Sequence, residues 1–495
     1  MTSVGPPQSH LKAAGWALGS GVIHQVSQVS VSLALAALLG PEAFGVVALA
    51  AIYVLFVEFL VRQGIVQAVI QKSDLTEEHT DAAFWMTLGT ALVLAVATVG
   101  FAGVWADLNS APSLRPLLIA LSGVALFQAC WQVPTALLQR ELDFRRSEVP
   151  LNIGTACGGL AGVTAALLGA EEWAVVVQLY TYGVVGSVLL YQATPWRPRW
   201  SFSWTAAREL LSVSSGALLA TMGSFFSQRA DSLLLGIFFG PLALGLYRLG
   251  SRFVQLIINV TSASLGRVAL AVLSREQADP TAYAKALRSQ LLSLNLLVFP
   301  ALGILLTTGR SVALLFGEEW ELAGPTLRIL CLAGLARAIT LFASPILQSM
   351  GKAHRAAASQ WYSAVAHVAA MTVAGLLLRD SSVADQIEGV AAARVVAQLV
   401  LINPVLLRMI SRTAVVPVRA LLSPLVSPVV GATAGIAAGL VVDEVCLRGA
   451  VPNLVTLVAV GTTSTLVSGG VLLAVSPEAR RLAERVALGL RSRRR

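Results

Sequence analysis

Long apolar stretches, separated by short polar or Gly-Pro turns, recur along the whole chain. About 20 apolar residues are enough to cross a bilayer as one helix. Fourteen such stretches can be placed, at residues 14–38, 43–70, 82–106, 115–138, 149–169, 172–193, 210–239, 243–271, 287–309, 325–350, 356–378, 386–410, 418–442 and 452–475. Because these stretches are continuously apolar rather than alternating, they predict an all-α integral membrane protein of about 14 transmembrane helices.

Two pairs of these predicted helices carry the same polar pattern, 200 residues apart. Residues 24–45 and 224–245 share a Ser-Gln pair, a Ser-Leu pair, a Gly-Pro turn and a glycine after that turn. Matched polar positions at one fixed offset indicate duplication, which is typical of secondary transporters. An even number of helices separates the copies, so we expect two six-helix lobes related by an axis along the membrane normal.

The duplication predicts how the chain is divided. We expect an N-terminal lobe at 1–194, a cytoplasmic linker at 195–209, a C-terminal lobe at 210–410, two further helices at 411–476 and a basic cytoplasmic tail at 477–495. The tail is predicted to be a short amphipathic helix that contacts anionic headgroups.

Basic residues predict the orientation of the helices, because loops on the cytoplasmic side are enriched in Lys and Arg. With the N-terminus inside, 23 of the 35 basic residues lie in cytoplasmic segments. Five fall outside, namely Arg115, Arg310, Arg328, Arg379 and Arg448. Both termini are therefore predicted to be cytoplasmic.

Composition excludes a soluble domain and gives no sign of catalysis. Charged residues make up 12% of the chain, against about 25% in soluble proteins, and the mean hydropathy is +0.75. The four cysteines have neither disulfide-framework nor metal-site spacing, so no metal or other cofactor is expected. The chain has no nucleotide-binding glycine loop, and the acidic residues at 318–321 come without a histidine or metal motif. We also expect the first helix to remain as an anchor, because no cleavable signal precedes it.

An ordered series of motifs resembles a known transporter family. It runs from Leu39-Gly-Pro-Glu-Ala-Phe-Gly45 and Gln71-Lys-Ser-Asp-Leu-Thr76 to Ala230-Asp-Ser-Leu-Leu-Leu-Gly236, Gly240-Pro-Leu-Ala-Leu-Gly-Leu-Tyr247 and Leu273-Ser-Arg275. The chain resembles Wzx-like polysaccharide flippases, of the WzxC and teichuronic-acid exporter type, within the multidrug/oligosaccharidyl-lipid/polysaccharide exporter superfamily. The resemblance is clear over about 20–290 and general beyond. It implies a bacterial cytoplasmic-membrane flippase for polyprenyl-diphosphate-linked oligosaccharides.

An ionisable residue inside a membrane-spanning helix costs free energy of insertion, so such residues usually have a structural or functional role. The predicted spans hold more arginines than acids: Arg62, Arg229, Arg248, Arg252, Arg267, Arg337 and Arg394 against chiefly Glu58 and Asp231. This imbalance predicts an electropositive cavity for an anionic cargo, and the planar guanidinium suits a diphosphate.

The sharpest pattern lies in the eighth predicted helix. Arg248, Arg252, Gln255 and Asn259 follow one another at helical spacing and form a stripe along one face, which Ser262 extends. The stripe either lines the cargo path or holds this helix to a neighbour by hydrogen bonds. We favour the cargo path, with Arg229, Arg62, Arg337 and Arg394 as further candidate contacts.

Three residues are expected to form structural ion pairs. Glu58 and Arg62 have the spacing of an intrahelical pair. Asp231 is expected to pair with Arg248 or Arg252 rather than to carry protons. His24 is expected to serve helix packing.

Together these features favour a lipid-linked oligosaccharide flippase that works by alternating access, not an enzyme. Its expected partners are the cargo, the bilayer and polysaccharide polymerase or export machinery, but no nucleic acid. The alternatives are a peptidoglycan-precursor flippase and, from another class, a membrane polysaccharide polymerase or ligase.

Overall fold

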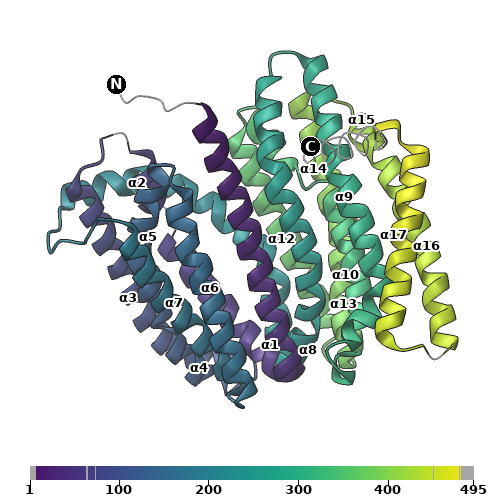
Figure 1. Cartoon of the computed structure of the whole chain (residues 1–495), viewed down its shortest axis with the longest axis horizontal. Helices are drawn as coiled ribbons and strands as arrows, with labels where there is room; N and C mark the ends of the chain where they lie inside the picture. The colour runs from purple at the N-terminus through teal and green to yellow at the C-terminus, as the bar shows by residue number, and fades with distance from the viewer. Residues whose placement is uncertain (1–6, 63–64, 73, 450, 479, 481–495) are drawn as a thin grey trace, which may run out of the picture. The chain divides into compact units, whose positions relative to one another are not determined.

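The computed structural model describes residues 7–62, 65–72, 74–449, 451–478 and 480, and all regular structure in these ranges is helical (Figure 1). Eleven described helices are long and apolar enough to cross a membrane. The prediction of an all-α membrane protein is therefore confirmed. The basic tail lies almost wholly outside the described residues.

The number fourteen stays a prediction, for two structural reasons. Two of the eleven candidate spans, 19–61 and 228–262, each overlap two of the predicted apolar stretches. In addition, the stretch predicted at 356–378 forms a helix, α12 (Ala353–Leu377), that is not among the eleven.

Contacts divide the chain into two compact units, residues 1–248 and 249–495. These contact units do not test the lobe boundaries expected from the duplication, which stay a prediction. The first unit contains α1 (Pro7–Arg62), α2 (Ile65–Gln71), α3 (Glu77–Leu108), α4 (Leu114–Leu121), α5 (Val124–Arg140), α6 (Phe144–Leu167), η1 (Glu171–Trp173), α7 (Ala174–Ala193) and the first part of α8 (Trp204–Arg275).

The first unit is held together by packing among its long helices. Helix α6 packs against α7 and α1, and α5 packs against α3 and α7. Glycines on α6 allow α7 to come close: a Cβ on Gly158 would lie 2.6 Å from the backbone oxygen of Gln178. His24 on α1 lies 3.3 Å from the hydroxyl of Thr155 on α6, a contact in keeping with a packing role.

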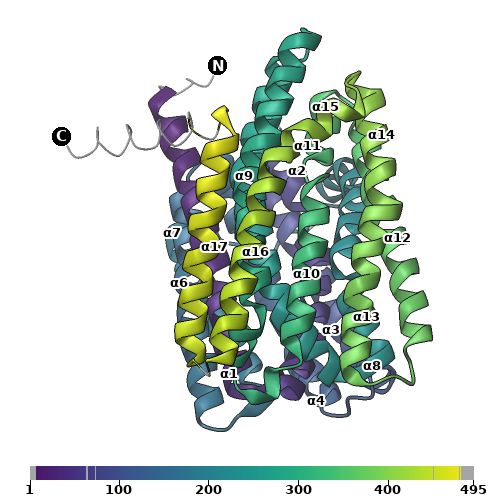
Figure 2. The ribbon, with the colours of Figure 1, turned by 90° about the vertical axis from the view of Figure 1, so that its right-hand side faces the viewer.

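The second unit contains the end of α8, α9 (Pro280–Leu314), η2 (Glu318–Trp320), α10 (Ala323–Ala338), α11 (Ala343–Ser349), α12, α13 (Val383–Val396), the π-helix η3 (Ala397–Ile402), α14 (Asn403–Ala414), α15 (Val418–Leu422), η4 (Ser423–Leu425), α16 (Val426–Arg448) and α17 (Asn453–Val475). Figure 2 shows α16 and α17 side by side, and both helices pack against α9.

The duplicated Gly-Pro turns have the same backbone conformation. Gly40 in α1 has φ 71° and ψ 171°, and Gly240 in α8 has φ 77° and ψ −171°. A positive φ favours glycine because it has no Cβ, and the proline that follows suits the first turn of the next helix. The repeat in sequence is therefore also a repeat in backbone conformation.

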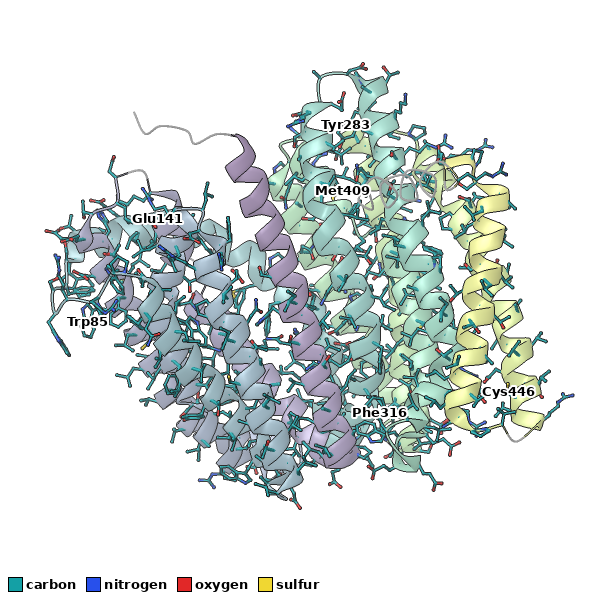
Figure 3. The ribbon with its side chains drawn as sticks, in the orientation of Figure 1. Trp85, Glu141, Tyr283, Phe316, Met409 and Cys446 are labelled. Carbon is teal, nitrogen blue, oxygen red and sulfur yellow. The ribbon has the colours of Figure 1, made fainter. Side chains whose placement is uncertain are left out.

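Side chains from segments of the same predicted sidedness lie at the same end of each unit (Figure 3). Trp85 and Glu141 share one end of the first unit, and both are predicted to lie near the cytoplasm. In the second unit, Tyr283 lies at the end opposite to Phe316 and Cys446, which are predicted to be external.

Candidate functional site

A buried polar cluster lies where the motif Ala230–Gly236 meets Tyr247 and Arg248. Asp231 accepts hydrogen bonds from the backbone N–H of Ser232 at 2.9 Å and from the hydroxyl of Tyr247 at 3.1 Å. Arg248 donates through Nη1 to the hydroxyl of Ser232 at 3.4 Å. All four residues are buried, and Arg248 and Tyr247 are fully so.

This cluster brings Asp231 and Arg248 together around Ser232. The expected ion pair of Asp231 with Arg248 or Arg252 stays a prediction, because the hydrogen bonds of this cluster link both Asp231 and Arg248 to Ser232. Sequence reasoning missed Tyr247 and Ser232 as its other members, although both belong to the family-like motifs. Because Arg248 is enclosed in the described conformation, a direct contact between Arg248 and cargo stays a prediction.

Arg229 lies in the same unit, with the two membrane acids as its electrostatic neighbours. The charges of Asp231 and Glu58 both act on its guanidinium. It is only partly buried, unlike Arg248. The side chain of Arg62 lies outside the described residues, so the expected Glu58–Arg62 pair stays a prediction.

The rest of the predicted stripe belongs to the second unit. Arg252, Gln255 and Asn259 follow at helical spacing in α8, and all three are partly exposed. The backbone oxygen of Asn259 accepts a hydrogen bond from the hydroxyl of Ser262 at 3.3 Å. The side chain of Arg252 is therefore partly accessible from outside the protein in this conformation, whereas that of Arg248 is not.

Arg337 on α10 and Arg394 on α13 are also partly exposed. Close to them in sequence lies a buried polar network that the sequence reasoning missed. Asn403 accepts hydrogen bonds from Thr340 at 2.9 Å and from Gln398 at 2.8 Å, and it donates to the backbone oxygen of Ala336 at 2.9 Å. The signal was an amide pair, Gln398 and Asn403, inside an apolar stretch. The π-helix η3 joins the two amides, and π-helical turns are frequent at functional sites.

Two further polar contacts join elements that are distant in sequence. In the second unit, Arg328 on α10 donates to Asp443 on α16 at 2.9 Å. In the first, Glu209 accepts from Lys72 at 2.6 Å and lies 3.1 Å from His79 Nε2. Hydrogen bonds from Lys72 and His79 lower the pKa of the exposed Glu209 carboxyl.

No group of His, Cys, Asp and Glu suited to a metal ion occurs among the described residues. The arrangement consists of guanidinium, amide and hydroxyl groups inside apolar helices. Such groups can hold an anion by charge-assisted hydrogen bonds.

Sequence comparison places the chain among proteins of polysaccharide biosynthesis. Residues 34–325 match the family described as "Polysaccharide biosynthesis protein". The succinoglycan biosynthesis transport protein ExoT of Rhizobium meliloti (strain 1021) is 27% identical over 320 residues, which cover 64% of this chain and 65% of that protein.

Two more curated relatives have similar coverage. The teichuronic acid biosynthesis protein TuaB of Bacillus subtilis (strain 168) is 23% identical, over 60% of this chain and 62% of its own length. The lipopolysaccharide biosynthesis protein WzxC of Escherichia coli (strain K12) is 22% identical, over 62% of this chain and 63% of its own. The chain thus matches between 62% and 65% of the length of these three relatives. They confirm the resemblance to the Wzx-like branch.

The helical fold of this chain is similar to that of solved transporter structures. The lipid II flippase MurJ, in an inward closed conformation, is similar with a TM-score of 0.70 and 12% identity, over 92% of this chain and 98% of that one. An inward-facing MATE family multidrug transporter of the MOP superfamily has a TM-score of 0.56 and 16% identity, over 80% of this chain and 94% of that one. At these identities the likeness shows the fold alone.

Proposed function

Because the chain belongs to the polysaccharide biosynthesis protein family, we propose that it is a flippase for a polyprenyl-diphosphate-linked oligosaccharide. It moves this cargo from the cytoplasmic to the external leaflet by alternating access, and so supplies cell-surface polysaccharide synthesis. Curated relatives named as a transport protein and as polysaccharide biosynthesis proteins support this proposal.

The observation that carries the proposal is the excess of arginine over acid inside the apolar helices. Five arginines, at positions 229, 248, 252, 337 and 394, have described side chains there, against Glu58 and Asp231. An ionised group inside a membrane helix is costly, and a diphosphate headgroup carries the negative charge that complements an excess of guanidinium groups. Guanidinium groups bind phosphate oxygens through two parallel donors, which a lysine cannot do.

In this proposal the partly exposed residues contact the cargo. Arg252 binds the diphosphate, and Gln255 and Asn259 continue the path without adding charge. Arg229, Arg62, Arg337 and Arg394 are further contacts. Arg248, which is fully buried, holds the cluster with Asp231 in the described conformation.

We place the protein in the bacterial cytoplasmic membrane with both termini in the cytoplasm. The charge distribution along the sequence supports this orientation. Its partners are the lipid-linked oligosaccharide, the bilayer and the polymerase or export machinery that consumes the flipped product.

The test replaces Arg252 and expresses the variant in cells that lack the wild-type protein. Arg252→Ala should abolish export of surface polysaccharide while the protein stays in the membrane at its normal level. Arg252→Lys should restore export only in part, because a point charge cannot reproduce two-donor contact with phosphate. Surface polysaccharide and membrane protein are measured on the same cells.

Arg275→Ala is the matched control, since this arginine is exposed at the end of the same helix. It should export normally. Export at the wild-type rate by Arg252→Ala would place the cargo site elsewhere. Normal surface polysaccharide in cells lacking the whole protein would contradict the proposed function itself.

A further inference from the structure

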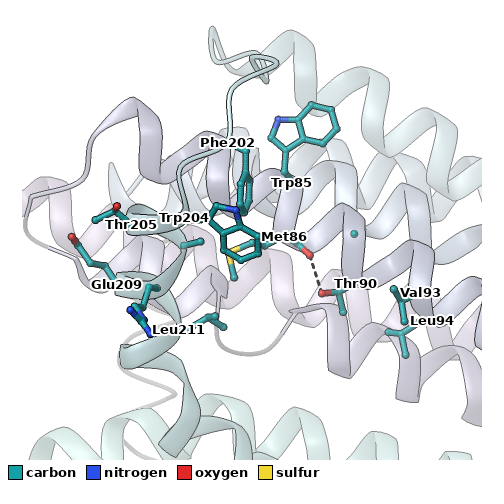
Figure 4. Close-up of a pocket in the computed structure, with 13 residues that line it drawn as sticks. Trp85, Met86, Thr90, Val93, Leu94, Phe202, Trp204, Thr205, Glu209 and Leu211 are labelled. Carbon is teal, nitrogen blue, oxygen red and sulfur yellow. Dashed lines mark hydrogen bonds between the residues drawn. The ribbon is translucent and has the colours of Figure 1, made fainter.

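A wide groove lies between the first half of α3 and the start of α8, within the first unit. Its volume is about 1100 Å³, and thirteen residues line it. Figure 4 shows Phe202 and Trp204 near Met86, with Thr90 and Val93 to one side and Glu209 to the other. This space is called the α3–α8 groove below.

The groove opens to the surroundings through apolar side chains. Trp204 is 80% exposed, Val93 68% and Leu211 51%. Exposed apolar surface of this kind on a membrane helix is suited to contact with lipid, and tryptophans gather at the level of the headgroups. The groove therefore has an exposed apolar side that an acyl chain could cover.

Near the start of α3, hydrogen bonds and aromatic packing fix the wall of the groove. Trp85 donates from its indole N–H to the backbone oxygen of Arg199 at 2.7 Å and packs against Trp200 in a tilted arrangement, with ring centroids 4.7 Å apart. The buried carboxylate of Asp81 accepts from the backbone N–H of Arg199 and from the hydroxyl of Ser201, each at 3.2 Å. These bonds hold the segment before α8 against α3.

The polar end of the groove carries an excess of positive charge. Glu209 and Arg208 both line it. The carboxylate of Glu209 is already matched by Lys72 at 2.6 Å, with His79 at 3.1 Å. Arg208 makes no ion pair with any residue that the structure describes. An anion is the complement of this end.

The long dimension of the groove suits a chain attached to that anion. Its α3 wall runs from Trp85 to Leu94, which is about 13 Å at 1.5 Å per residue. Gly89, between them, has no atom within 4 Å of the place where a Cβ would be, so the groove has open space there. A basic group at one end of the groove and exposed apolar side chains along the rest are complementary to an amphiphile.

We propose that the α3–α8 groove binds one anionic phospholipid, with its phosphate at Arg208 and an acyl chain along Met86, Gly89 and Val93. This lipid belongs to the leaflet at the end of the first unit where α3 begins. The site is separate from the arginines assigned to cargo, and it does not depend on what the protein transports.

The test is native mass spectrometry of the full-length protein with added phosphatidylglycerol or phosphatidylcholine. The wild type should retain one phosphatidylglycerol molecule in preference to phosphatidylcholine. Arg208→Ala should lower that retention about five-fold, the effect of one basic group near an anionic lipid. Arg275→Ala removes an exposed arginine from the other end of α8 and should leave retention unchanged.

A second variant tests the acyl channel without touching charge. Gly89→Leu fills the open space in the groove and should reduce retention of both lipids. Gly100→Leu adds the same bulk to α3, also where nothing lies within 4 Å, and should have no effect. Melting temperature checks that all variants remain folded.

Equal retention of both lipids by the wild type, or unchanged retention in Arg208→Ala and Gly89→Leu, would overturn the proposal. Displacement of bound phosphatidylglycerol by an equimolar polyprenyl phosphate would also overturn it, because the groove would then be a station for the cargo lipid. These readouts are independent of polysaccharide export, so failure here leaves the proposed function standing.

Discussion

At the scale of single residues, burial separates arginines that look alike in sequence. Arg248 and Arg252 are one helical turn apart, yet Arg248 is fully buried and Arg252 is partly exposed. Arg248 donates to the hydroxyl of Ser232, whose backbone N–H in turn donates to Asp231, so polar groups lie beside the buried guanidinium. A buried charge is tolerated only where such groups surround it.

Removing the acid from this cluster should destabilise the protein. In Asp231→Ala, the hydroxyl of buried Tyr247 loses the carboxylate that it bonds at 3.1 Å. A buried donor left without its acceptor costs about 1–3 kcal/mol. We expect a lower melting temperature in detergent and less protein in the membrane.

Asp107→Ala is the control for this change, because Asp107 is an exposed acid near the end of α3. It should melt like the wild type. An unchanged melting temperature in Asp231→Ala would show that the cluster does not depend on its carboxylate.

At the scale of elements, the two Gly-Pro turns contact each other reciprocally within the first unit. A Cβ on Gly45 would overlap the backbone oxygen of Pro241, and a Cβ on Gly245 would overlap that of Pro41. Each copy of the repeat thus places its glycine against the turn of the other copy. Backbone cannot yield as a flexible side chain can, so both positions require glycine.

Alanine at either position should therefore be harmful, against the usual trend. Gly→Ala within a helix ordinarily stabilises it by about 0.5–1 kcal/mol. Gly45→Ala and Gly245→Ala should instead lower the melting temperature, because the added methyl group forces the two turns apart. Thermal unfolding in detergent measures this.

Gly21→Ala supplies the comparison, since this glycine of α1 has open space around it. It should be neutral or slightly stabilising. If all three variants behaved alike, the close approach of the two turns would not be a constraint on the protein.

At the scale of the whole molecule, the orientation in the membrane is the main prediction. The uneven distribution of basic residues places the 138–149 segment inside and the 106–115 segment outside. A single cysteine in each segment can report its side of the membrane, provided that the position is exposed. Ser147 is unsuitable, because it is fully buried and a cysteine there would be protected on either side. Glu141 in the first segment and Ser110 in the second are both exposed.

Single cysteines at these positions should report opposite sides. In a background without the four native cysteines, an impermeant thiol reagent applied to intact cells should label Ser110→Cys and not Glu141→Cys. Both should react once the cells are permeabilised. Labelling of Glu141→Cys in intact cells would reverse the orientation of the first unit.

Local patterns in the sequence were enough to predict the membrane class, the apolar helical stretches and the two Gly-Pro turns. Each of these features depends on local chemistry: a bilayer requires every spanning segment to be apolar and to satisfy its own backbone, and a positive φ selects glycine wherever it occurs. Gly40 and Gly240 could therefore be identified without knowledge of their surroundings. The excess of arginine could be counted in the same way.

Which faces of these helices are enclosed depends on the packing of the helices against one another. The polar stripe of α8 marks one face of that helix but does not separate its buried positions from its exposed ones, so the burial of Arg248 could not be predicted from its place in the stripe. The contact of Glu209 with Lys72 and His79 joins residues more than 120 positions apart. The α3–α8 groove likewise exists only because the segment before α8 is held against α3. Such contacts depend on the packing of distant segments, which no local pattern encodes.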